Sequence, residues 1–210
     1  MGGRGEAAGV ANRVVAAGPK VSFDAAVVLL GSRANSDRAK GAQALAAMEP
    51  DKEHRAGVIS KLAEVWREED GITQPAAAEA LAVWGDDAME KAFIDRLLAG
   101  RRDERAGIFA VLAHRKTATA AQALARRLRV ADDAVLVESH LLRMGGVAEG
   151  AVRGMLTDLD KKVCCAAARI LQEIGTAESL PDLQKAAEDS NVMLSSGAKL
   201  AMEAIKARAR

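Results

Sequence analysis

The sequence predicts an all-α protein assembled from paired helices, and three observations support this prediction. Half of the 210 residues are apolar, and alanine, the strongest helix former, is the most frequent of them. Aromatic residues make up only 2% and tyrosine is absent, whereas β-sandwiches and barrels draw on aromatic and β-branched residues. A helical pattern also recurs along the chain about every 30 residues, which is typical of stacked helical hairpins.

The clearest copy of the recurring unit covers residues 160–183. Asp160 is placed to cap a helix whose apolar residues share one face. Gly175 then supplies a stop, since glycine tolerates the left-handed conformation at a helix end. A second helix follows with Pro181 in its first turn, where the missing N–H costs little. The apolar face of the first helix consists of Val163, Ala167, Ile170, Leu171 and Ile174.

Echoes of this unit occur on both sides. Downstream, Asp189 is placed to cap a helix whose first buried residue is expected to be Val192, followed by Ala198, Leu200, Ala201 and Ile205. Upstream, the glycine after the first helix recurs at Gly85 and Gly146. One leucine from each first helix is expected to face the core, and this leucine series comprises Leu45, Leu81, Leu112, Leu142, Leu171 and Leu200.

The pattern places the helices in order along the chain. An opening helix is predicted over 22–31. First helices of later units are predicted over 36–48, 73–84, 103–113, 132–144, 161–174 and 190–207. Second helices are predicted over 52–66, 86–98, 117–129, 148–158 and 177–188. Residues 1–20, rich in glycine and alanine, are interpreted as a disordered or tethering segment, and residues 21–210 as one helical domain.

The strongest unit also carries a family resemblance. The string Asp160-x-x-Val163-x-x-x-Ala167-x-x-Ile170-Leu171-x-x-Ile174-Gly175 resembles the first helix and turn of a HEAT repeat, of the short bacterial kind also found in phycobilisome-lyase-type proteins. Leu180-Pro181-x-Leu183 is similar to the start of that family's second helix. The resemblance is sharp over 160–206 and fair over 73–100 and 131–159. Over 21–67 and 101–130 only the periodicity remains, and His114-Arg115-Lys116 replaces the turn glycine.

The resemblance implies a right-handed alpha-alpha superhelix, a solenoid of about five to six HEAT-like helical hairpins. In such solenoids the second helices line the concave face, so the resemblance also implies that a binding groove lies along them.

Local charge suggests which residues would serve that groove. The net charge is only +1, which gives no overall attraction for nucleic acid or anionic membranes. Between residues 101 and 129, however, eight Lys and Arg residues face only two acidic ones. Two interpretations are open. These cations form a solvated helix face, or they bind an acidic peptide or a nucleic-acid phosphate. The candidate binding residues on second helices are Lys91, Arg126, Arg127, Arg129 and Arg153.

No residue pattern in the sequence indicates catalysis, so we expect a protein that is not an enzyme and has no cofactor. His54, His114 and His140 fall in different units without a second His or Cys at helical spacing, which disfavours a metal site. No phosphate loop or nucleophile elbow occurs. Asp86-Asp87 and Asp132-Asp133 each begin a predicted helix, where carboxylates cap the backbone and favour the helix dipole.

The remaining signals concern compartment and core. Cys164 and Cys165 are interpreted as small core thiols in a reducing compartment, with a redox switch as the alternative. No apolar run approaches the roughly 20 residues of a bilayer span, and a cytoplasmic location is expected. Trp66 and Trp84 lie at helix ends and are interpreted as core residues, with exposed partner anchors as the alternative.

These observations favour a non-catalytic helical-repeat scaffold that binds another protein through the groove of the second helices. Two alternatives stay open. The first is binding of a nucleic-acid phosphate backbone through the basic patch at 101–129, although the scarcity of aromatic residues disfavours selective single-strand binding. The second is an accessory protein of the bilin lyase kind, which the resemblance suggests but for which the sequence shows no acidic and aromatic pocket.

Overall fold

The computed structural model describes residues 21–67, 72–99 and 105–210, and every regular element within these ranges is a helix. The prediction of an all-α protein is therefore confirmed. The segment predicted over residues 1–20 lies outside the described residues. Among the described helices, none is both long and apolar enough to cross a lipid bilayer.

The helices agree closely with the predicted positions. In the first half of the chain they are α1 (Phe23–Leu30), α2 (Asn35–Ala46), α3 (Arg55–Arg67), α4 (Thr73–Trp84), α5 (Asp87–Leu98) and α6 (Arg105–Arg115). In the second half they are α7 (Ala118–Arg126), α8 (Ala131–Met144), α9 (Glu149–Arg153), α10 (Lys161–Ile174), α11 (Leu180–Ala187) and α12 (Val192–Arg208). Short 3₁₀ turns complete the set: η1 (Arg127–Arg129), η2 (Gly145–Ala148), η3 (Gly154–Thr157) and η4 (Ala177–Ser179).

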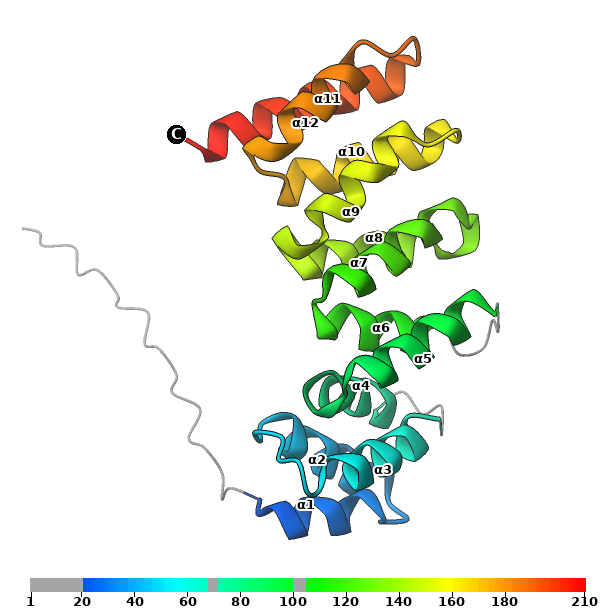
Figure 1. Ribbon diagram of the computed structural model, residues 1–210, viewed down its shortest axis with the longest axis vertical. Coiled ribbons are helices and arrows are strands. Elements are labelled where there is room, and N and C mark those ends of the chain that lie inside the picture. The colour runs from blue at the N-terminus through cyan, green and yellow to red at the C-terminus, as the bar shows by residue number, and fades with distance from the viewer. Residues whose placement is uncertain (1–20, 68–71, 100–104) are drawn as a thin grey trace, which may run out of the picture.

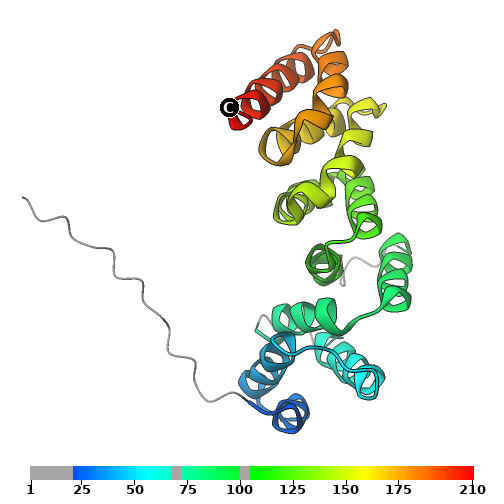
Figure 2. The same cartoon turned by 60° about the vertical axis from the view of Figure 1, so that its left-hand side comes forward.

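The helices follow one another along the long axis of the molecule in chain order (Figure 1). One layer consists of α2, α4, α6, α8, α10 and α12, and each of these helices contacts the next. In the other layer α5 contacts α7 and α7 contacts α9, with α3 and α11 at its two ends. Figure 2 shows the two layers side by side, and the stack bends so that α4, α6 and α8 lie on its inner side in this view.

The segment 145–157 differs most from its predicted form. A single helix was expected over 148–158, but α9 covers five residues and is flanked by the 3₁₀ turns η2 and η3. Glycines explain the difference, because each one costs up to about 1 kcal/mol relative to alanine in a helix interior. The glycines of this segment are Gly145, Gly146, Gly150 and Gly154.

Most of the predicted leucine series lies in the core. Leu45, Leu81, Leu112 and Leu171 are fully buried, which confirms the period over these units. The prediction for Leu142 is wrong by one residue. It is only partly buried, whereas Leu141 is fully buried and lies four residues before Gly145, the residue that follows α8.

The predicted cap of the last unit is wrong by two residues. Asn191, and not Asp189, caps α12, since its side-chain oxygen accepts a hydrogen bond of 3.1 Å from the Leu194 backbone N–H. The shift turns Val192 and Leu200 toward solvent, with exposed fractions of 77% and 56%. The predicted positions Ala198, Ala201 and Ile205 are buried as expected, and Leu194 completes the core face of α12.

The turn glycines are needed for space more than for a left-handed backbone. Gly85 and Gly175 follow α4 and α10 in an extended conformation, which corrects the expectation of a left-handed stop. A Cβ at Gly85 would lie 2.4 Å from the Leu81 carbonyl oxygen, and one at Gly175 would lie 2.5 Å from that of Leu171. The left-handed region is used after α8 by Gly145, with φ 65°, and after α6 by Lys116, with φ 50°.

Both tryptophans belong to the core. Trp84 is fully buried, and its Nε1 donates a hydrogen bond of 2.8 Å to the Leu45 carbonyl, which ties α4 to α2. Trp66 is buried too, with its ring edge-on to Phe93 at a centroid distance of 5.0 Å. The interpretation of both as core residues is therefore confirmed, and neither is an exposed anchor.

Candidate functional site

The structure brings only part of the predicted basic patch together. Arg126, Arg127 and Arg129 lie at the end of α7 and in η1, while Lys91 is on α5 and Arg153 on α9. Four of these five cations form ion pairs. Only Arg126 has none among the described residues, and its side chain is exposed in α7.

Each ion pair removes positive charge from the predicted patch. Lys91 Nζ lies 2.5 Å from the Asp95 carboxylate within α5. Arg129 Nε lies 2.6 Å from an Asp158 oxygen, and Arg153 Nε lies 2.9 Å from an Asp182 oxygen. The predicted residues are therefore close to neutral as a set and give little net field for a phosphate backbone.

Most of these pairs connect neighbouring units rather than neighbouring residues. The Asp133 side chain is almost fully buried at the start of α8, where it accepts hydrogen bonds from Arg127 Nε at 2.9 Å and Arg105 Nη1 at 2.6 Å. Because a buried charge requires a close opposite charge, this triad holds α6, η1 and α8 in one arrangement. Further pairs across units join Lys161 to Asp189 at 2.6 Å and Arg169 to Glu138 at 2.8 Å.

Two buried glutamates connect units in a related way. Glu90 on α5 accepts a hydrogen bond of 2.6 Å from Thr117, the cap of α7. Glu149 on α9 accepts hydrogen bonds from Thr176 and Ser179, which lie between α10 and α11 of the next hairpin. Burial raises the pKa of Glu149, but the hydrogen bonds from Ser179 and Thr176 outweigh this effect, so the pKa is lower than usual. Both carboxylates are fully engaged in linking hairpins.

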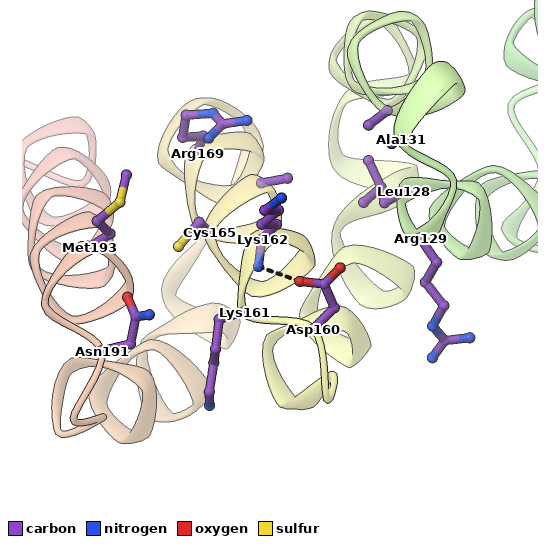
Figure 3. Close-up of a pocket in the computed structure, with 12 residues that line it drawn as sticks. Leu128, Arg129, Ala131, Asp160, Lys161, Lys162, Cys165, Arg169, Asn191 and Met193 are labelled. Carbon is purple, nitrogen blue, oxygen red and sulfur yellow. Dashed lines mark hydrogen bonds between the residues drawn. The ribbon is translucent and has the colours of Figure 1, made fainter.

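A groove of about 700 Å³ lies between the N-terminal ends of α8, α10 and α12 (Figure 3). We call it the α8–α10–α12 groove. Its apolar lining comes from Leu128, Ala131, Ala134, Cys165, Ala166 and Met193. Its polar lining comes from Arg129, Asp160, Lys161, Lys162, Arg169 and Asn191.

The cations of the groove differ in what they can offer a ligand. Arg129, Lys161 and Arg169 are in the ion pairs described above. The ammonium of Lys162 has no partner among the described residues, and only its backbone N–H is used, in a 2.9 Å hydrogen bond to Asp160 (Figure 3). A bound carboxylate could therefore contact Lys162 without breaking an existing ion pair of the groove.

The two cysteines have different surroundings. The Cys164 thiol is buried and donates to the Asp158 carbonyl at 3.2 Å, and burial raises its pKa, so it is an unreactive core thiol as expected. Cys165 is half-buried and lines the groove. Within the described ranges, no group of three or more His, Cys, Asp or Glu side chains is placed to hold a metal ion.

Exposed apolar side chains lie on two of the helices that line the groove. Val135 of α8 is 83% exposed, and Val192 and Met193 of α12 are 77% and 76% exposed. Exposed apolar groups next to a groove are typical of surfaces that bind another protein. The sequence analysis did not identify this surface, because a cap at Asp189 placed Val192 in the core.

Comparison with known proteins adds little to this description. No family model matches the chain, and no curated protein matches it. Two solved structures of engineered proteins from the Northeast Structural Genomics Consortium are similar to it. One is 21% identical over 88% of this chain and 96% of its own, with a TM-score of 0.41, and the other is 22% identical over 88% and 58%, with a TM-score of 0.40. These similarities are too low to support a functional argument.

Proposed function

We propose that this chain is a non-catalytic, HEAT-like helical-repeat scaffold that binds a segment of another protein in the α8–α10–α12 groove. The observation that carries the proposal is the apolar lining of that groove beside the exposed Val135, Val192 and Met193. The contacts between successive helices of each layer and the ion pairs between units support a right-handed alpha-alpha superhelix as the architecture.

The groove suggests the chemistry of the bound segment. Apolar side chains of a partner would leave water on the Met193 and Ala134 surface, at about 25 cal/mol per Å² of apolar area buried. An acidic residue beside them would reach Lys162, whose ammonium is unpaired among the described residues. The expected ligand is therefore a segment with one or two apolar side chains followed by a carboxylate.

The location predicted from the sequence remains a separate hypothesis. The second helices carry Lys91, Arg127, Arg129 and Arg153 in ion pairs, so Arg126 is the residue of that set best able to contact a partner. Substituting Arg126 by Glu tests whether the α7 surface contributes to binding. The same pairing disfavours the nucleic-acid alternative, because phosphate contacts would have to displace internal carboxylates.

The test uses capture of partners by the tagged full chain, with two matched substitutions. Met193→Asp places a charge in the groove, while Val28→Asp places one on α1, where Val28 is 74% exposed and far along the chain from the groove. Quantitative mass spectrometry of the captured proteins is expected to show one set lost with Met193→Asp and retained with Val28→Asp. Retention by both variants, or equal loss from both, would refute the groove as the interface.

A further inference from the structure

Several departures from the repeating pattern meet at one small pocket on the first-helix layer. The pocket has a volume of about 260 Å³ and is lined by Ala113, His114, Lys116 and Arg143. It lies where the C-terminal end of α6, the turn into α7 and the last turn of α8 come together. We call it the Lys116–Arg143 pocket. It shares no lining residue with the α8–α10–α12 groove, so the inference below does not rest on the proposed function.

The backbone at Lys116 is the first departure. Lys116 stands four residues after Leu112, where the units with Leu81, Leu141 and Leu171 have a glycine. It has φ 50°, and no other residue except glycine has a positive φ in the described chain. A lysine in this conformation costs more than a glycine would, and such local cost is found preferentially where a side chain has a function.

The second departure is His140, which occupies the repeat position held by Ile170 in α10. Its side chain is buried against Phe109, and its Nδ1 lies 2.6 Å from Arg143 Nη2. Burial, together with the Arg143 charge, lowers the pKa of His140 to about 4, so the ring is neutral at pH 7. Because a guanidinium only donates, the neutral ring accepts its hydrogen bond and orients Arg143 without cancelling its charge.

The charge of the pocket is the third observation. Arg143 and Lys116 contact no carboxylate among the described residues, whereas Arg105, Arg127 and Arg129 all do. The acidic group facing the pocket is Glu79 of α4, which is half exposed and lies 3.9 Å from His114 Nε2. The two cations, Lys116 and Arg143, and the imidazole of His114 therefore line the same pocket. The carbonyls at the ends of α6 and α8 also attract these cations, but they do not neutralise them.

We propose that the Lys116–Arg143 pocket binds a phosphate monoester group. A phosphate monoester is close to a dianion at pH 7 and accepts several hydrogen bonds. The guanidinium of Arg143 matches two of its oxygens, the ammonium of Lys116 supplies a point charge, and His114 supplies a ring nitrogen. The volume admits the phosphoryl group and a few atoms beyond it, which fits a small phosphate ester or one phosphorylated side chain.

The test is isothermal titration of the full chain with inorganic phosphate, phenyl phosphate and a phosphoserine peptide, at pH 7 and low ionic strength. Arg143→Gln keeps a donor for His140 but removes the charge, and is expected to weaken binding of all three at least about tenfold. Lys116→Gly is expected to weaken binding while raising the melting temperature, a combination that a purely structural lysine would not produce. Glu79→Gln is expected to tighten binding, since it removes the facing carboxylate.

Lys185→Gln is the matched control, because it removes an exposed charge on α11. Tighter binding of the phosphoserine peptide than of its unphosphorylated form and of inorganic phosphate would identify a phosphorylated side chain as the source. Tighter binding of phenyl phosphate than of inorganic phosphate and of the phosphoserine peptide would identify a free small ester as the source. Absence of binding at millimolar phosphate, or equal weakening by Lys185→Gln and Arg143→Gln, would overturn the proposal.

Discussion

The register of α8 allows the sharpest test of the fold, because two adjacent leucines have opposite expectations. The period counted along the sequence assigned Leu142 to the core, and the structure assigns Leu141. Leu141→Ala removes a fully buried side chain between helices and leaves a cavity, so the free energy of unfolding is expected to fall by about 3–5 kcal/mol. Leu142→Ala trims a partly buried side chain at the surface, and a fall of about 1 kcal/mol is expected.

Urea unfolding of the full chain, followed by circular dichroism at 222 nm, measures both values. Leu200→Ala is the matched control, since Leu200 is 56% exposed and its loss is expected to change stability by less than about 0.5 kcal/mol. A cost for Leu142→Ala equal to or above that for Leu141→Ala would restore the register counted from the sequence.

Three further predictions follow from the buried polar groups and the turn after α6. Asp133→Ala leaves Arg105 and Arg127 without their shared carboxylate, and a loss of about 3–5 kcal/mol in the free energy of unfolding is expected from urea titration. The pKa of His140 is about 4 in the folded chain and ordinarily 6.5, so the unfolded chain binds a proton that the folded chain excludes between these values. Stability is therefore expected to be full above pH 6.5 and to fall by up to about 3 kcal/mol as the pH drops to 4, and His140→Leu is expected to remove this slope in parallel pH titrations. Lys116→Gly relieves a left-handed lysine, and a gain of about 1 kcal/mol is expected in calorimetry, where a loss would contradict the cost assigned to this residue.

The candidate sites were only partly predictable from the sequence. The cations Arg129 and Arg153 were identified, but not their partners Asp158 and Asp182, which lie 29 residues away in each case. The signal was present, because opposite charges one repeat period apart face each other when hairpins stack. Counting charge within a window of the chain misses these ion pairs, because it treats each cation as free.

The pocket at Lys116 was visible in the sequence only as an irregularity. His114-Arg115-Lys116 replaced a turn glycine, whereas the sequence placed His140 on the surface or edge of a first helix, and the structure buries it. That these residues meet depends on how α6 and α8 pack, which no local pattern contains. Arg143 connects the two irregularities, because it contacts His140 and lines the same pocket as Lys116.

The sequence by itself determined the all-α class and the positions of nearly all helices. Alanine content, apolar periodicity and capping residues act within a few residues of one another, so they can be read from a single chain. Only the tertiary structure decided which leucine of α8 enters the core and which cations remain unpaired. A shift of one residue turns a side chain by about 100° around a helix, so packing between helices decides which leucine is buried. An ion pair joins groups a whole unit apart, so the same packing decides which cations have a partner.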